Sequence, residues 1–154
     1  MQRRSFVFAG LGLPTLAFAH HGWSSFDQER PIWLEGRVTR VRWQNPHAEL
    51  ELEPPRDLRV PPDLPTRSLP SQSAPVDGKS LLARATVPTR SRPRWTVELA
   101  PLTRMRAWNV KEIQVGDTIG VLGFTFKQEQ GDPLLRAEYL FVDGRAYGLR
   151  SSPA

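Results

Sequence analysis

Apolar and polar residues alternate along several short stretches of the chain, which is typical of half-buried β-strands. The first stretch runs from Ile32 to Trp43, and its period of two slips near Thr39 and Arg40, which predicts a β-bulge. A turn at residues 44–46 follows. The next stretch, His47–Glu53, alternates cleanly and predicts a second strand. Its expected inward residues are Ala48, Leu50 and Leu52.

Patterns typical of strands and helices resume near residue 94. Alternation over residues 94–99 predicts a third strand, and Pro101–Trp108 is expected to form a short helix. The apolar run Ile119–Phe126 predicts a buried fourth strand, and Leu135–Val142 a fifth. Ala137, Tyr139 and Phe141 are expected to share one face of the fifth strand. Asp143 and Gly144 are expected to end that strand, and residues 148–154 to form a polar tail.

The segment between the second and third strands has a different composition. Nine of the forty residues 54–93 are proline. Proline at this density interrupts both helices and strand ladders. The sequence therefore predicts a long, mostly disordered insertion here.

The expected order is three strands, a short helix and two more strands, with a first strand that bends in its middle. This order is that of the OB-fold, a five-stranded Greek-key barrel with one helix. The sequence thus predicts an all-β, OB-like barrel over residues 32–147, interrupted by the insertion at 54–93. A small β-sandwich is the alternative.

The first nineteen residues have the features of a cleavable signal peptide. Arg3 and Arg4 precede a short apolar run, and Ala17–Ala19 is a small-x-small cleavage site. The paired arginines also fit the twin-arginine export pattern, although the general export route stays open. We therefore expect a periplasmic protein with an arm over residues 20–31 and no membrane span after cleavage.

Composition narrows the possible functions. The chain has 154 residues, a formal net charge of +5 and no cysteine, which excludes disulfides, thiolate metal sites and a cysteine nucleophile. The insertion holds seven basic and three acidic residues, so the positive charge belongs mainly to it and not to the predicted barrel. Together with export, this makes nucleic acid an unexpected partner.

The three histidines are the strongest candidates for chemistry. His20 and His21 would be the first two residues after cleavage, and His47 begins the second strand. An N-terminal histidine offers an amine and an imidazole, nitrogen ligands that suit Cu(II) and then Zn(II). We expect His47 to be a third ligand only if the arm can reach it. The alternative is a mobile polar terminus and an ordinary turn histidine.

Tryptophan offers a second candidate site. Trp23, Trp33 and Trp108 are candidate contacts for a sugar, peptide or envelope-protein ligand, as on other OB barrels, whereas Trp43 and Trp95 are expected to point inward. No nucleophile and base stand out, so we expect no enzymatic activity and no catalytic residue.

A set of short motifs resembles the DUF6152 family of small exported bacterial proteins. The motifs are Ala19–Trp23, Phe26–Asp27, Leu34–Val38, Trp43–Ala48, Trp95 with Glu98 and Leu99, Val115–Asp117, Gly123 and Asp143–Arg145. They span residues 19–53 and 94–147. The resemblance implies export and a β-barrel, and it implies no particular activity. The long insertion departs from the family pattern, as does Gly22, where a serine is usual.

Overall fold

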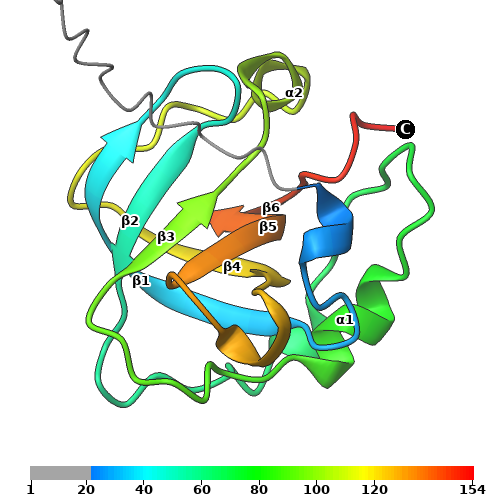
Figure 1. Cartoon of the computed structure of the whole chain (residues 1–154). Helices are drawn as coiled ribbons and strands as arrows, with labels where there is room; N and C mark the ends of the chain where they lie inside the picture. Colours follow the sequence, from blue (N-terminus) through cyan, green and yellow to red (C-terminus); the bar gives the residue numbers. More distant parts are fainter. Residues whose placement is uncertain (1–21) are drawn as a thin grey trace, which may run out of the picture.

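The computed structural model describes residues 22–154 (Figure 1). Strands and short helices follow one another along the chain. Their bounds are η1 Trp23–Ser25, β1 Ile32–Arg42, β2 Glu49–Glu53, η2 Leu64–Thr66, α1 Gly78–Arg84, β3 Trp95–Glu98, α2 Leu102–Ala107, β4 Thr118–Phe124, η3 Lys127–Glu129, β5 Leu134–Val142 and β6 Arg145–Gly148. The five predicted strands and the helix between β3 and β4 are all present.

Five of the strands close into a barrel. The sheet order is β3-β2-β1-β4-β5-β6, and an additional parallel pairing between β3 and β5 joins the two ends of the five-stranded part. Closure leaves no free edge between these strands, so their backbone groups bond to one another. The predicted all-β barrel is confirmed, with α2 lying across one end (Figure 1).

The length of β1 lets one strand serve two parts of the barrel wall. Its first half pairs with β4, from Ile32 to Arg37, and its second half pairs with β2. The register with β2 shifts between Val38 and Arg40, so the predicted β-bulge lies where it was expected. Gly36 allows the bend, because a side chain there would overlap the backbone of Glu53.

The barrel encloses an interior core of alternating residues from every strand. Ala48, Leu50 and Leu52 on β2 and the segment before it are fully buried, as predicted. The same core includes Trp95, Val97, Val121 and Leu140 from the other strands. Period-two alternation therefore placed the inward face of β2 and β3 correctly.

One predicted face is wrong, because β5 contains a second bulge. Leu122 pairs with Tyr139 and Gly123 pairs with Ala137, so Glu138 is an extra residue in the ladder. Ala137 packs in the interior core, whereas Tyr139 packs on the outside of the barrel. The bulge puts successive residues on one side of the strand, which period-two alternation does not anticipate.

The chain after β5 is also more ordered than expected. Asp143 and Gly144 have φ values of 52° and 71° and form a hairpin turn into β6, where the sequence predicted only the end of β5. The tail beyond β6 then pairs with the insertion: Ser73 donates its backbone N–H to the carbonyl of Ser152, at 3.0 Å.

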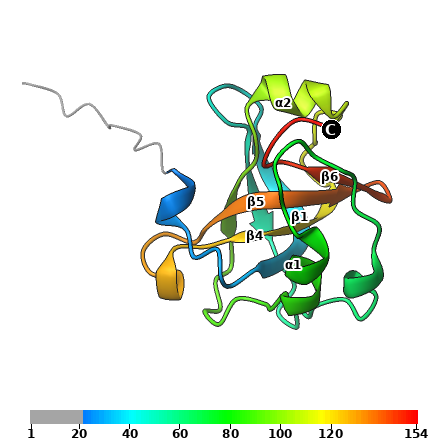
Figure 2. The same ribbon diagram turned by 90° about the vertical axis from the view of Figure 1, so that its right-hand side faces the viewer.

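The structure differs from the predicted disorder of residues 54–93. Leu64, Leu81 and Leu82 from this insertion are buried against Trp33 and Leu122 of the barrel wall. Figure 2 shows the insertion, with α1, lying across the outer side of β1, β4 and β5. We call this second set of residues the outer cluster; its buried members are Phe26, Trp33, Leu64, Leu81, Leu82, Leu122, Phe124 and Tyr139.

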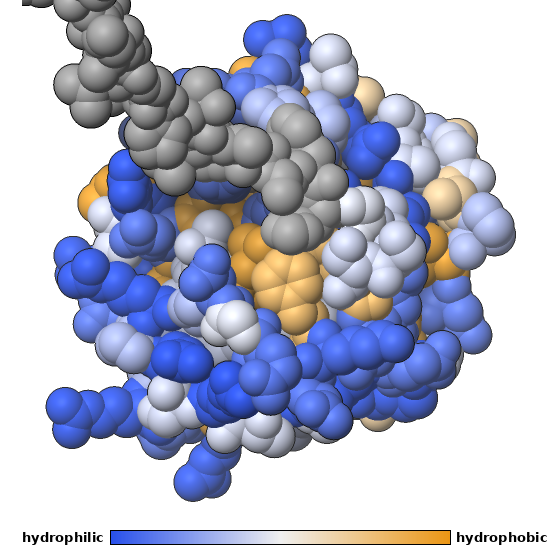
Figure 3. All heavy atoms as spheres, in the orientation of Figure 1, coloured by the Kyte–Doolittle hydropathy of each residue, from blue (hydrophilic) through white to orange (hydrophobic). Residues whose placement is uncertain are grey.

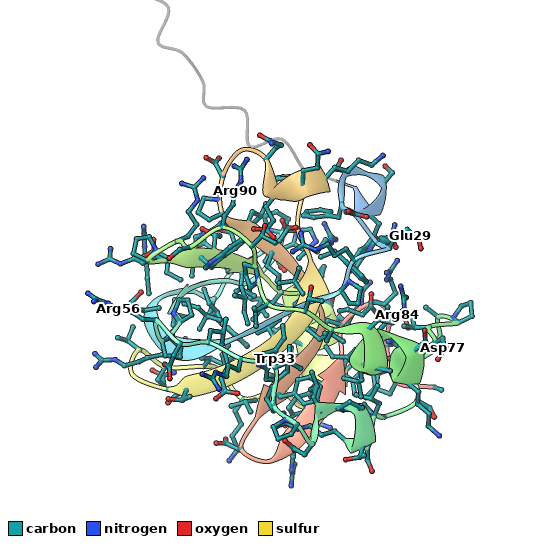
Figure 4. The ribbon with its side chains drawn as sticks, turned by 90° about the horizontal axis from the view of Figure 1, so that it is seen from below. Glu29, Trp33, Arg56, Asp77, Arg84 and Arg90 are labelled. Atoms are coloured by element: carbon teal, nitrogen blue, oxygen red, sulfur yellow. The ribbon has the colours of Figure 1, made fainter. Side chains whose placement is uncertain are left out.

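Proline density misled the prediction because it argues only against regular hydrogen-bonded ladders. An irregular chain can still bury leucines, provided that its backbone groups find partners. Arg84 of α1 bonds to the carbonyl of Glu29 at 2.9 Å, so the insertion also contacts the N-terminal arm (Figure 4). The predicted signal peptide lies outside the described residues. Among residues 22–154, no helix has the length and hydropathy needed to cross a membrane.

Candidate functional site

His47 lies at the end of the barrel where β1 turns into β2. The side chain of Asn45 accepts a hydrogen bond from the backbone of Leu102 at 3.1 Å, which ties this turn to the start of α2. Ala48 then bonds to Ala100 and Leu99, so that the ladder between β2 and β3 continues up to His47. These contacts fix the backbone that carries the imidazole.

The imidazole lies on the outer face of the barrel between a carboxylate and a guanidinium. Nδ1 of His47 is 3.4 Å from Oε1 of Glu98, and Nε2 is 3.5 Å from Nη2 of Arg136. Arg136 in turn donates to Glu98 at 2.8 Å. The register explains the arrangement, because Glu98 of β3 pairs with Arg136 of β5 on one side and with Glu49 of β2 on the other.

The N-terminal arm joins this group of side chains through Trp23. The indole ring lies between two guanidiniums, with the Arg136 Cζ atom 4.5 Å and the Arg150 Cζ atom 3.6 Å from its centroid. Arginines stack favourably on the face of a tryptophan ring. Figure 3 shows the face of the barrel next to the arm, where hydrophilic side chains surround a smaller apolar patch.

A second buried carboxylate completes the group. Glu138, the extra residue of the β5 bulge, is fully buried and pairs with Arg150 at 2.6 Å. Gln72 of the insertion bonds to Glu138 at 3.3 Å and to the hydroxyl of Tyr139 at 3.2 Å. The bulge places both residues on the outer face, where one glutamine side chain can reach them.

Burial perturbs the charged groups in this cluster. Burial raises the pKa of Glu138, and the hydrogen bond and charge of Arg150 act in the opposite direction. Burial also lowers the pKa of Arg136, which Glu98 counteracts, while the nearby charges of Arg104 and Arg150 lower it further. The site therefore combines three arginines with two glutamates around one tryptophan and one histidine.

The predicted metal ligands fall into two groups. His20 and His21 lie outside the described residues. His47 is in place, with a side chain that is 18% exposed. Residues 22–154 contain no group of three or more histidine, aspartate or glutamate side chains arranged to hold a metal ion.

The three tryptophans predicted to contact a ligand are all engaged within the protein. Trp33 is 0% exposed and packs in the outer cluster, beneath the guanidinium of Arg67. Trp108 is half-buried, and its Nε1 donates to the carbonyl of Ser151 at 2.8 Å. Trp23 lies between the two arginines. Their predicted role in binding remains a prediction.

Sequence reasoning missed most of the residues that surround His47. Glu98, Arg136 and Glu138 are charged residues within strands, and by alternation alone such residues are assigned to a solvent-facing side. They are buried because β3 pairs with β5 and because the arm and insertion cover them. The only sequence signal was the unusual presence of two charges within the otherwise apolar β5.

Comparison of the chain with known protein families gives one match. The model of DUF6152, described as a family of unknown function, matches residues 10–58. The match confirms the resemblance to DUF6152. The matched range includes the described arm, β1, the turn before His47 and β2, and Glu98 and Arg136 lie beyond it. The chain matches no curated protein and no solved structure.

Proposed function

We propose that this protein is exported to the periplasm, is not an enzyme, and binds Cu(II) or Zn(II) through its N-terminal histidines and His47. The observation that carries the proposal is the return of the arm to His47. Trp23 packs on Arg136, and Arg136 lies 3.5 Å from the imidazole. Trp23 of the arm is therefore separated by one side chain, that of Arg136, from the histidine that the sequence placed at the opposite end of β1.

Chain length is compatible with a shared site. His21 and His20 precede Trp23 by two and three residues, and an extended chain spans about 3.5 Å per residue. Roughly 10 Å of chain thus separates the predicted α-amine from Trp23. This length supports a site shared by the N-terminal histidines and His47.

The surroundings of His47 suit a metal ligand in one respect and oppose it in another. Ligating histidines commonly direct their second ring nitrogen at a carboxylate, which orients the ring, and Glu98 lies on the Nδ1 side of His47. The guanidinium of Arg136 opposes a cation at Nε2. The carboxylate of Glu98, which pairs with Arg136, offsets part of that charge.

Titration calorimetry on a protein that begins at His20 tests the proposal directly. We expect sub-micromolar affinity for Cu(II), weaker affinity for Zn(II), and a marked loss of both in His47→Gln. Glu98→Gln should weaken binding about 10- to 100-fold, as for other residues that orient a ligand. Thermal unfolding of each variant separates loss of binding from loss of fold.

A matched control addresses the amine. Adding one residue before His20 blocks the amine chelate but keeps every side chain. Unchanged affinity in this extended protein would rule out the amine as a ligand, and unchanged affinity in His47→Gln would remove His47 from the site. The mass of the protein recovered from the periplasm tests export and the position of the first residue. The alternative function is the binding of a small ligand or a protein without a metal. Each tryptophan that is a candidate for such binding already contacts other residues of the protein.

A further inference from the structure

The two ends of the proline-rich insertion lie side by side at the base of the barrel. Residues 54–60 follow β2 and residues 87–94 precede β3, and β2 and β3 are paired up to Leu52 and Trp95. The two segments together line a hollow of about 340 Å³. This hollow is separate from the site around His47.

Arginine dominates the lining of this hollow. Arg56 comes from the first segment, and Arg90 and Arg92 come from the second; no carboxylate is among the lining residues. Arg59 and Arg94 are exposed beside it, and Asp57 is the one acidic residue in the two segments. Across the described part of the chain, none of these five arginines forms an ion pair with a protein carboxylate.

The fold holds the backbone that carries these arginines. The buried carboxylate of Glu129 accepts hydrogen bonds from the backbone of Thr89 and Arg90, at 2.8 and 2.9 Å. Prolines 54, 55, 88 and 93 restrict the backbone on either side. Figure 4 shows Arg56 at the left edge of the view and Arg90 towards its top, both away from α1 at the right.

Five arginines against the one acidic residue Asp57 leave an excess of positive charge around the hollow, because the nearby carboxylate of Glu129 pairs with Arg30. Such an excess favours an anion from solution. Guanidiniums bind phosphate oxygens with two parallel hydrogen bonds, and several of them around one hollow favour a multiply charged anion over a single carboxylate. We propose that this hollow is a binding site for a phosphate-bearing anion. Arg56, Arg90 and Arg92 supply the contacts, and Arg59 and Arg94 strengthen the surrounding field.

Calorimetry with inorganic pyrophosphate at low ionic strength tests the site on the full chain. The triple variant R56Q/R90Q/R92Q should bind about a hundredfold more weakly than the unmodified protein. The variant R106Q/K111Q/R145Q removes the same charge from exposed positions elsewhere and should change binding by less than about threefold. Arg92→Gln alone, at an exposed position, should weaken binding without affecting the thermal unfolding temperature.

A second arm distinguishes the source of the phosphate. Sedimentation with vesicles of phosphatidylglycerol and phosphatidylethanolamine, compared with pure phosphatidylcholine vesicles, tests a lipid headgroup. Binding of vesicles alone identifies a membrane phosphate, and binding of pyrophosphate identifies a soluble one. Equal losses in the two triple variants, full binding by R56Q/R90Q/R92Q, or no binding of either probe would overturn the proposal. Copper affinity should be the same in all these variants, so the two proposals fail separately.

Discussion

The same strands bury two hydrophobic clusters, one on each side of the barrel wall. The interior core is enclosed by five strands that hydrogen-bond in a ring. The outer cluster is instead covered by the insertion and the arm, which we call the cover. Both contain fully buried side chains. They differ in what holds the covering in place. A continuous ladder of backbone bonds encloses the core, whereas isolated backbone bonds, such as the one from Trp33 N–H to the carbonyl of Thr86, and side-chain contacts hold the cover.

This difference predicts that the cover opens more easily than the barrel. Local opening requires the loss of fewer backbone hydrogen bonds where the chain is irregular. A truncation in the interior core should then lower the free energy of unfolding by the full cost of a cavity. A truncation in the outer cluster should lower it less, because the cover can move into the space. The predictions below test that contrast in order of decreasing effect.

Truncating one leucine on each side gives the largest expected contrast. Leu52→Ala removes a fully buried side chain from the interior core and should lower the free energy of unfolding by about 4 kcal/mol. Leu82→Ala, in the outer cluster, should cost about 2 kcal/mol because the insertion can move into the space. Chemical denaturation measures both. Equal costs would mean that cover and barrel form one equally rigid unit.

Adding a methyl group gives the second contrast. Gly123→Ala would place the new carbon against the backbone carbonyl of Arg136, so the barrel wall itself must shift, at a cost of about 3 kcal/mol. Gly78→Ala meets the side chains of Leu69 and of the buried Tyr139 but no backbone atom, so the insertion can shift, and the substitution should cost less, about 2 kcal/mol. A larger loss in Gly78→Ala than in Gly123→Ala would contradict the assignment of the cover as the softer region.

Glu129 fastens the cover, and its effect should depend on pH. Burial alone would raise its pKa, but hydrogen bonds from the backbone of Thr89 and Arg90, together with Arg30, bring the pKa below its ordinary value. The lowered pKa means that the contribution of Glu129 to stability is present at neutral pH. It is lost as the pH falls below the ordinary value of 4.5 towards the folded-state pKa.

Glu129→Gln should therefore cost about 1–2 kcal/mol at pH 7 and remove part of the acid dependence of stability. Hydrogen exchange of the backbone N–H groups of Thr89 and Arg90 measures the opening of this segment. Glu112→Gln removes the same charge from an exposed position and serves as the control. Similar acid dependence in the unmodified protein and Glu129→Gln would show that this carboxylate does not fasten the cover.

The smallest expected effect concerns the start of α1. The side chain of Asp77 accepts a hydrogen bond from the backbone of Ser80 at 3.0 Å and caps the helix. Asp77→Ala should lower the free energy of unfolding by about 1 kcal/mol, and Asp77→Asn, which keeps an acceptor, should restore most of it. An equal loss in both variants would point to the charge of Asp77 and away from its capping bond.

The two clusters also differ in how well the sequence predicted them. Leu50 and Leu52 were placed in the interior because period-two alternation identifies the buried face of a strand directly. The outer cluster was not foreseen, because the leucines of the insertion lie among prolines and show no period. The bulge in β5 reversed the face of Tyr139, and no local signal marks the extra residue Glu138.

The candidate site also combines a residue that the sequence predicted with residues that it did not. His47 stood out because the chain has only three histidines, and their placement favoured metal chemistry. Its neighbours Glu98 and Arg136 could not be identified, since they come from β3 and β5 and meet only through a parallel pairing. The arginines of the insertion were likewise expected to belong to a disordered segment. In the structure this segment is folded, and Arg56, Arg90 and Arg92 line a hollow.

The sequence by itself determined five of the six strands and their order, the bend in β1 and the residues of the interior core on β2 and β3. Local patterning carries this information, because each strand must present one apolar face. Only the tertiary structure decided which charges are buried together, what covers the outside of the barrel and where the arm returns. Those features depend on contacts between segments tens of residues apart, and no pattern within a single segment encodes them.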